Sequence, residues 1–232
     1  MSKRASSTRT GTPFEEIRRE ALIRLGGEAT LAERLPVPKT PAELRAVPDD
    51  RYLSRMSFRI FAAGLKHSMV EAKWPAFEEA FHGFLPKRVA AMHDEELEAL
   101  MQDRRLIRHW GKIRSVPANA AAMLEIAAEH GSFGTWLADW PGDDITGLWQ
   151  DLGKRFSQLG GMSGAYFLRM VGKDSFVPTP YVLRALRHWG RYDGSGKGKA
   201  EQRRLQAAFN ALAGETGLPL CQLSMTLAAS ID

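Results

Sequence analysis

Apolar residues recur at helical spacing along almost the whole chain, and this periodicity constrains the fold more than any other feature. In "FEEIRREALIRLGG", one broad side of a predicted helix, which two glycines end, holds Phe14, Ile17, Ala21, Ile23 and Leu25. Few segments alternate between apolar and polar residues at period two, and none carries a hairpin signature. The sequence therefore predicts an all-α protein.

Local signals place several of these helices. Thr40 with Glu43 has the spacing of a capping box, and Gly131 closes an alanine-rich helix. One helix is expected to begin near Asp94. Within the segment 50–81, a long helix is predicted up to Trp74-Pro75, and a second, short helix is predicted after it.

Length and composition favour a globular protein without a membrane span. The 232 residues can bury a sizeable core, as one large domain or two intimate lobes. No apolar run approaches the roughly 20 residues that a membrane helix needs. The basic, polar stretch 1–13 lacks the apolar segment of a secretory signal, so we expect it to be disordered, with a single helical domain over 14–232.

The single cysteine and the net charge limit the disulfides, metal sites and partners that the chain can have. The lone Cys221 excludes an internal disulfide and a zinc site built on several thiolates, and it suits a reducing cytoplasm. The formal net charge of +5 permits a polyanionic partner. Residues 104–114 hold five Arg or Lys and no acid, and residues 183–204 hold seven against two acids. Both runs fit nucleic-acid contacts, and both fit solvated helix faces equally well.

A glycine-rich break separates two helical runs in "FSQLGGMSGAYFLRMVG", residues 156–172. It is open to two interpretations. The first is an ordinary turn between packed helices. In the second, the unpaired N–H groups and positive dipole end of the second helix bind a phosphate, which the glycines allow to approach closely. Under the second interpretation, the DNA backbone would be contacted by Leu159, Gly160, Gly161, Met162, Ser163 and Gly164.

The stretch "LGGMSGAYFLRMVGKDSFVPTPYVLRAL" resembles the helix-hairpin-helix segment of the DNA glycosylase superfamily. A second stretch resembles the DNA-3-methyladenine glycosylase I family, and "RHWGKI" is its most specific piece. The residues that carry this resemblance are Ala63-Gly64-Leu65, Phe81-His82, Val89-Ala90-Ala91-Met92, Gln102-Asp103, Ile107-Arg108-His109, Gly111-Lys112-Ile113 and Asn119-Ala120. The resemblance spans about residues 52–190.

The resemblance implies a helix-hairpin-helix glycosylase-like fold in which two helical lobes flank a cleft. It implies double-stranded DNA with a damaged base as partner, base flipping, and hydrolysis of the N-glycosidic bond in base-excision repair. No lysine lies where a Schiff-base nucleophile is expected, so the enzyme would be monofunctional and leave an abasic site uncut. We further expect a monomer in the cytoplasm, associated with the nucleoid, with no cofactor. Beyond the glycine-rich break, Lys66, His109 and Lys112 are the expected DNA contacts.

The chain also departs from the family pattern. The family's zinc ligands are absent, so no metal is expected. Arg59 stands where the family has its base-reading carboxylate, and Lys66 and His67 replace its small pair and tryptophan. Thr179 takes the place of the superfamily's catalytic aspartate, with Tyr181 two residues on. The expected catalytic set is therefore Arg59, His67, Thr179 and Tyr181.

Several alternatives stay open at this level. Arg59 and His67 either remake the pocket for a different lesion, with a preference for neutral or negatively polarised base edges, or belong to a catalytically dead pocket that still binds DNA. Arg59 could instead pair with Glu71, Glu78 or Glu79. His109 and Lys112 could merely cap a helix C-terminus. A non-catalytic DNA-binding or damage-recognition module is thus the second hypothesis, and a protein-interaction domain is a third.

Overall fold

The computed structural model describes residues 13–231, so the predicted disordered stretch lies outside the described residues except for Pro13. Within this range the chain forms helices and no strand, which confirms the all-α prediction. The α-helices are α1 Phe14–Leu25, α2 Glu28–Arg34, α3 Pro41–Ala46, α4 Asp49–Ala62, α5 His67–Ala80, α6 Pro86–Ala90, α7 Asp94–Leu100, α8 Trp110–His130, α9 Phe133–Asp139, α10 Ile145–Arg155, α11 Met162–Val171, α12 Pro180–His188, α13 Lys199–Thr216 and α14 Leu220–Ala229. Two 3-10 turns, η1 His82–Phe84 and η2 Gly142–Asp144, complete the set.

The described chain divides into two compact units. Pro38–Ser175 form one unit, and the segments on either side, 13–37 and 176–231, form the other. The single domain over 14–232 stays a prediction, since two compact units can belong to one domain. The cleft expected between two lobes stays a prediction as well.

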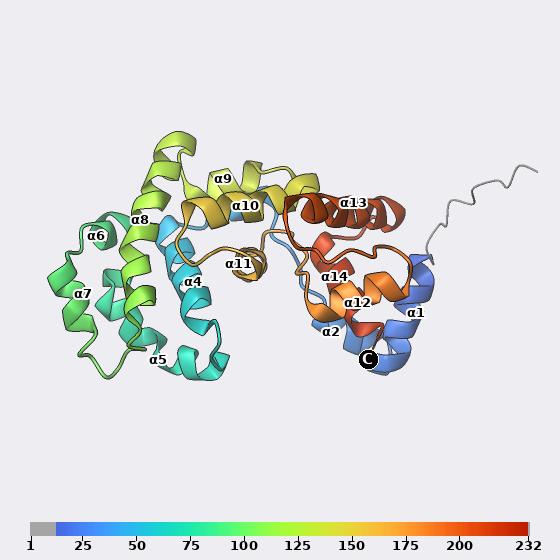
Figure 1. The fold of residues 1–232 in the computed structure, drawn as a ribbon, viewed down its shortest axis with the longest axis horizontal. Helices are drawn as coiled ribbons and strands as arrows, with labels where there is room; N and C mark the ends of the chain where they lie inside the picture. The colour runs from blue at the N-terminus through green and yellow to red at the C-terminus, as the bar shows by residue number, and fades with distance from the viewer. Residues whose placement is uncertain (1–12, 232) are drawn as a thin grey trace, which may run out of the picture. The chain divides into compact units, whose positions relative to one another are not determined.

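In the unit Pro38–Ser175, α4 is the central helix. It packs against α5, α8, α9 and α11, and it lies between α8 and α11 in Figure 1. Its side chains Tyr52, Leu53, Met56, Ile60 and Phe61 are all at most 1% exposed, which shows that one broad face of α4 is committed to the core. Because α4 is held in the core, the residues on its last turn keep a fixed position beside two neighbouring helices.

The helix boundary predicted within residues 50–81 is wrong. The break falls at Ala63–Lys66, where Gly64 adopts a left-handed φ of 81°, and Pro75 lies inside α5. Proline removes one backbone donor from a helix, but packing outweighs this local cost here. The Trp74 ring stacks on Phe77 at 4.9 Å and on Phe84 at 5.5 Å between centroids, which holds the helix together around Pro75.

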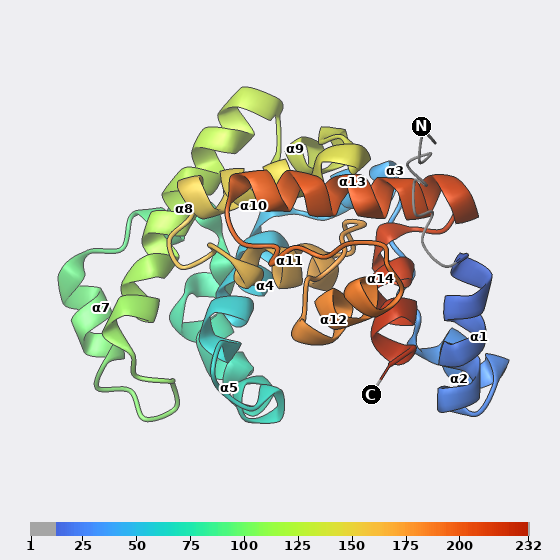
Figure 2. The same cartoon turned by 45° about the vertical axis from the view of Figure 1, so that its right-hand side comes forward.

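In the other unit, α14 is the central helix. It packs against α1, α12 and α13, which surround it in Figure 2. The Phe176 and Phe209 rings stack with centroids 3.9 Å apart, and both are fully buried. Cys221 is 2% exposed, as expected for a small buried side chain. None of the helices between residues 13 and 231 combines the length and apolar character that a bilayer crossing requires.

Candidate nucleic-acid interface and base site

The glycine-rich break forms a turn between α10 and α11. Gly161, the residue before α11, has a φ of 60° and a ψ of −134°, a region that favours glycine. A Cβ on Gly153 of α10 would lie 3.1 Å from the Gly160 Cα, and a Cβ on Gly164 would lie 3.2 Å from the Leu159 carbonyl. These glycines therefore let the turn lie directly against both of its helices.

The surface of the turn faces solvent. Gly160, Gly161 and Met162 are exposed, whereas Leu159 and Gly164 are buried and anchor the two ends. Among the described hydrogen bonds outside the helices, the one donated by this turn joins the Ser163 amide to the Gly160 carbonyl at 3.3 Å. The first amides of a helix have no intrahelical acceptor, so the exposed start of α11 has the general character of an anion-binding helix N-terminus.

Two side chains fix the turn to its surroundings in α8. The amide of Asn119, fully buried, donates from Nδ2 to the Ser157 carbonyl at 3.1 Å and accepts from the Ser157 N–H at 2.7 Å. Gln158 donates from Nε2 to the Gly111 carbonyl at 2.7 Å. Gln158 has a φ of 61°, an uncommon conformation for a residue other than glycine. The turn is therefore held in one place by the helix that also carries Lys112.

Lys112 and His109 cap helix ends. The Lys112 ammonium donates to the carbonyls of Phe61 and Ala63, at 3.2 and 2.9 Å, at the C-terminus of α4. His109 precedes α8 and accepts the Lys112 N–H on Nδ1 at 3.3 Å. Lys112 therefore caps the C-terminus of a helix, α4, which is the alternative considered for it. His109 instead caps the N-terminus of α8. Their contact with DNA stays a prediction.

Arg59 lies on the last turn of α4, half-buried, with its guanidinium over the Tyr166 ring of α11 at 4.8 Å from the centroid. The expected alternative partners are engaged elsewhere: Glu78 pairs with Arg51, and Glu79 pairs with Arg105. No ion pair among the described residues joins Arg59 to Glu71. The Arg59 Nε is buried and has no hydrogen-bond partner among residues 13–231.

Lys66 and His67 follow the break after α4. Both are exposed, and His67 is the first residue of α5. The His67 ring packs at 5.4 Å from the ring of Phe58, the α4 residue beside Arg59. The structure therefore places Arg59, His67 and Lys112 around the C-terminal end of α4, and it adds Tyr166 of α11 to this group.

Thr179 and Tyr181 belong to the other unit. Thr179 is the N-cap of α12, where its Oγ1 accepts the Val182 N–H at 3.2 Å. Tyr181 is 56% exposed and carries the Arg184 guanidinium over its ring at 5.1 Å. It also borders a cavity of about 230 Å³ lined by Leu25, Leu31, Arg34, Tyr181, Met225, Ala228 and Ala229.

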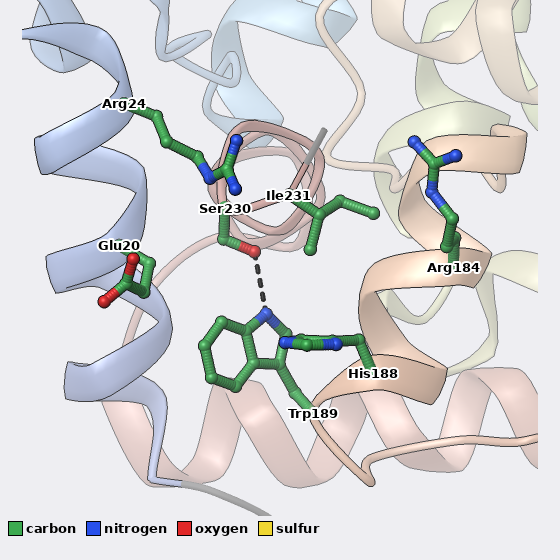
Figure 3. Close-up of a pocket in the computed structure, with 7 residues that line it drawn as sticks. All are labelled: Glu20, Arg24, Arg184, His188, Trp189, Ser230 and Ile231. Carbon is green, nitrogen blue, oxygen red and sulfur yellow. Dashed lines mark hydrogen bonds between the residues drawn. The ribbon is translucent and has the colours of Figure 1, made fainter.

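A second cavity in this unit, about 410 Å³, is lined by Glu20, Arg24, Arg184, His188, Trp189, Ser230 and Ile231 (Figure 3). The Trp189 Nε1 donates to the Ser230 Oγ at 2.8 Å, and the His188 ring packs edge-on against the indole at 4.7 Å. Trp189 is thus an anchored wall of the cavity and not a free stacking surface. Arg24 and Arg184 lie on opposite sides of it in the same view.

Two residues of the site were missed by sequence reasoning. The buried positions of α11 are Gly164, Ala165, Phe167, Leu168 and Val171, and Tyr166 lies between them on the helix surface. Helical periodicity could therefore have placed Tyr166 off the core face. The second signal is Asn119, a polar residue at helical spacing from the apolar positions Val116, Ala120 and Met123, because a polar group on a buried face needs a partner.

Comparisons with known proteins identify the resemblance independently. The methyladenine glycosylase family matches residues 45–155. The chain is 44% identical over 64 residues to DNA-3-methyladenine glycosylase 1 of Escherichia coli, and 42% identical over 62 residues to the DNA-3-methyladenine glycosylase of Haemophilus influenzae. These stretches cover 28% and 27% of this chain, and the chain spans about a third, 34%, of each of the two curated relatives. The expected resemblance to this family is confirmed.

Solved structures support the fold. The 3-methyladenine DNA glycosylase I of Staphylococcus aureus superposes with a TM-score of 0.51 at 21% identity, over 67% of this chain and 91% of that one. The 8-oxoguanine DNA glycosylase of Methanocaldococcus jannaschii superposes with a TM-score of 0.55 at 13% identity, over 91% of both chains. The fold is therefore an all-α fold that this chain shares with helical DNA glycosylases.

Proposed function

We propose that this protein is a monofunctional DNA glycosylase that hydrolyses the N-glycosidic bond of alkylated bases, of the 3-methyladenine type, in base-excision repair. The observation that carries the proposal is the family match over residues 45–155, a range that contains Arg59, His67 and Lys112. The partner would be double-stranded DNA with a damaged base, bound by a monomer in the cytoplasm, at the nucleoid.

The turn before α11 would hold the DNA backbone. Its exposed glycines leave space for a phosphate, and the outward amides of the helix start supply donors and a favourable dipole. Such a contact is made to the sugar–phosphate backbone, so it has no base-sequence preference of its own. The exposed Lys66 would add a positive charge from the loop after α4.

The chemistry would begin with flipping of the damaged base, which costs a few kcal/mol and least for a base that pairs poorly. The C1′–N bond breaks with its electron pair leaving on the base, and a water oxygen bonds to C1′ and gives up a proton. Arg59, His67 and Tyr166 would line the base site, because they surround the end of α4. Thr179 and Tyr181, which belong to the other unit, stay the catalytic candidates that the resemblance implies.

A specific observation favours a second function, a catalytically inactive damage-recognition protein. Arg59 and Thr179 occupy the positions at which the resemblance leads one to expect carboxylates, and Thr179 is already engaged as a helix cap. Such a protein would bind duplex DNA in a salt-sensitive way without breaking a bond.

Base release from methylated duplex DNA separates the two functions. We expect mass spectrometry to detect free methylated bases, while the DNA strand stays intact until its abasic sites are cleaved by alkali. The matched control is the same protein with methylated single strands and with unmodified duplex. Salt-sensitive binding without release of any base would leave only the inactive damage-recognition protein.

A further inference from the structure

Carbonyl groups at the end of α4 receive donors from Lys112. The last carbonyls of a helix have no intrahelical donor, so they need partners from elsewhere. The Ala62 carbonyl accepts the Leu65 N–H at 3.1 Å, from the segment that follows the helix. The carbonyls on either side of it, those of Phe61 and Ala63, accept from the Lys112 ammonium at 3.2 and 2.9 Å. One side chain therefore joins the last turn of α4 to the segment after it.

The backbone of Lys112 is itself held in place at the start of α8. The Lys112 N–H donates to His109 Nδ1 at 3.3 Å, and the Lys112 carbonyl accepts from the Ser115 hydroxyl at 2.7 Å. The carbonyl of the preceding residue, Gly111, accepts from the Gln158 Nε2 at 2.7 Å. The ammonium thus reaches the end of α4 from a backbone that is bonded on both sides.

The Lys112 ammonium is already engaged inside the protein. The residue is half-buried, and burial lowers its pKa, as does the charge of Arg59. A phosphate contact would have to break the two hydrogen bonds to the carbonyls, which would leave acceptors at the helix end without donors. Three other cations of the same basic run are exposed to solvent, namely Arg104, Arg108 and Arg114.

The segment that Lys112 holds leads directly into the candidate base site. It comprises residues 63–66, contains Gly64 with its φ of 81°, and ends where His67 begins α5. Glycine has many accessible conformations, so hydrogen bonds from outside the segment help to keep it in one. We propose that Lys112 is a positioning residue, whose ammonium holds this segment and His67 in place for the damaged base, and that it does not contact DNA. This inference rests on the proposed function, and it replaces the DNA contact that the sequence predicts for Lys112.

Two lysine variants with the same substitution test the inference. Lys112→Met keeps the aliphatic part of the side chain and removes the charge and the donors. Lys87→Met makes the same change at an exposed lysine of α6 in the same unit. Duplex binding would be measured by fluorescence anisotropy at two salt concentrations. Base release from methylated duplex would be measured in single turnovers, with the protein in saturating excess.

We expect Lys112→Met to bind duplex within about twofold of the unmodified protein and with the same salt dependence, because no phosphate contact is lost. Its rate of base release should fall about tenfold, since a displaced active-site group costs at least this much. Lys87→Met should change neither quantity by more than about twofold, because an exposed charge is well screened. Weaker and less salt-dependent binding by Lys112→Met, or an unchanged rate of release, would overturn the inference.

NMR keeps the test independent of catalysis and of the stability of the variant. In Lys112→Met the amide signals of Gly64 and Leu65 should shift, and unchanged signals would overturn the inference. In the unmodified protein, the side-chain signals of Lys112 should stay in place when duplex is added, whereas a salt-reversible shift would show a phosphate contact and overturn it. If the unmodified protein releases no base, the proposed function fails, while these signals still decide the role of Lys112.

Discussion

Asn119 shows how one side chain can position the candidate interface. Its buried amide makes two hydrogen bonds to Ser157, one to the backbone N–H and one to the carbonyl. The N–H and the carbonyl of Ser157 belong to the segment that leads into the glycine turn. If the amide is removed, the backbone groups of Ser157 lose their partners, and the turn keeps only the Gln158 hydrogen bond to the Gly111 carbonyl of α8.

Replacement of Asn119 by alanine should therefore be costly. We expect Asn119→Ala to lower the free energy of unfolding by about 1–3 kcal/mol, measured by urea denaturation. It should also weaken duplex binding, because two of the hydrogen bonds that hold the turn against α8 are lost. The matched variant Gln158→Ala removes a single exposed bond to the Gly111 carbonyl and should cost less than about 1 kcal/mol. Equal losses for the two variants would contradict a special role for Asn119.

Some site residues could be predicted at this scale and some could not. The capping of α3 by Thr40 with Glu43 follows from local spacing, and the structure contains the capping box. The partners of Arg59 could not be predicted, because Glu78 and Glu79 are taken by arginines that approach from other segments. The contact of Lys112 with the end of α4 likewise joins residues about fifty positions apart. Sequence spacing carries no information on such distant pairs.

At the scale of elements, the α10–α11 turn lies close to both of its helices on one side and is exposed to solvent on the other. Gly153 and Gly164 serve the packing, since a Cβ at either position would press on the turn. At Gly160 an added Cβ would have no neighbour within 4 Å, and the backbone there does not adopt a left-handed φ. Gly160 is therefore the position at which the surface of the turn can be changed without disturbing its fold.

Substitution at Gly160 tests the phosphate contact. Gly160→Asp should weaken binding to all duplex sequences alike, by about tenfold at low salt, because the new carboxylate repels phosphates. Gly160→Ala is the control and should bind within about twofold of the unmodified protein. Both variants should unfold within about 0.5 kcal/mol of it, as surface changes usually do. Unchanged binding by Gly160→Asp in fluorescence anisotropy would exclude this turn from the interface.

The junction of α4 and α9 makes the stability depend on pH. Asp49 of α4 accepts the Phe133 N–H at 3.0 Å, and burial raises its pKa above 3.8. The folded protein then holds this proton more tightly than the unfolded chain does. As the pH rises from 3.8 through the raised pKa, ionisation of Asp49 therefore lowers the free energy of unfolding.

Asp49→Asn mimics the protonated group and keeps an acceptor for the Phe133 amide. At neutral pH we expect the variant to be more stable, by less than about 1 kcal/mol, because the half-buried carboxyl is partly screened. The advantage should shrink as the pH falls toward about 4, where the native Asp49 becomes protonated. Thermal unfolding from about pH 4 to pH 7 measures this difference. An advantage that grows with acidity would show that the charge of Asp49 stabilises the fold.

At the scale of the whole molecule, the fold class was predictable because helical periodicity runs through the sequence. The family match stops at residue 155, yet the likeness to the 8-oxoguanine DNA glycosylase of Methanocaldococcus jannaschii covers 91% of this chain. The shared fold therefore extends beyond the segment that the family model matches. The pairing of residues 13–37 with 176–231 in one unit could not be predicted, because no local pattern links the two ends.

The central claim is that backbone amides at the glycine turn hold a DNA strand, and amide NMR tests it most directly. An isotope-labelled chain would be titrated with undamaged duplex DNA at two salt concentrations. The account predicts that the amide signals of Gly160, Gly161, Met162 and Gly164 shift together, and that added salt reverses the shifts. Binding that shifts other amides and leaves these four unchanged would contradict it.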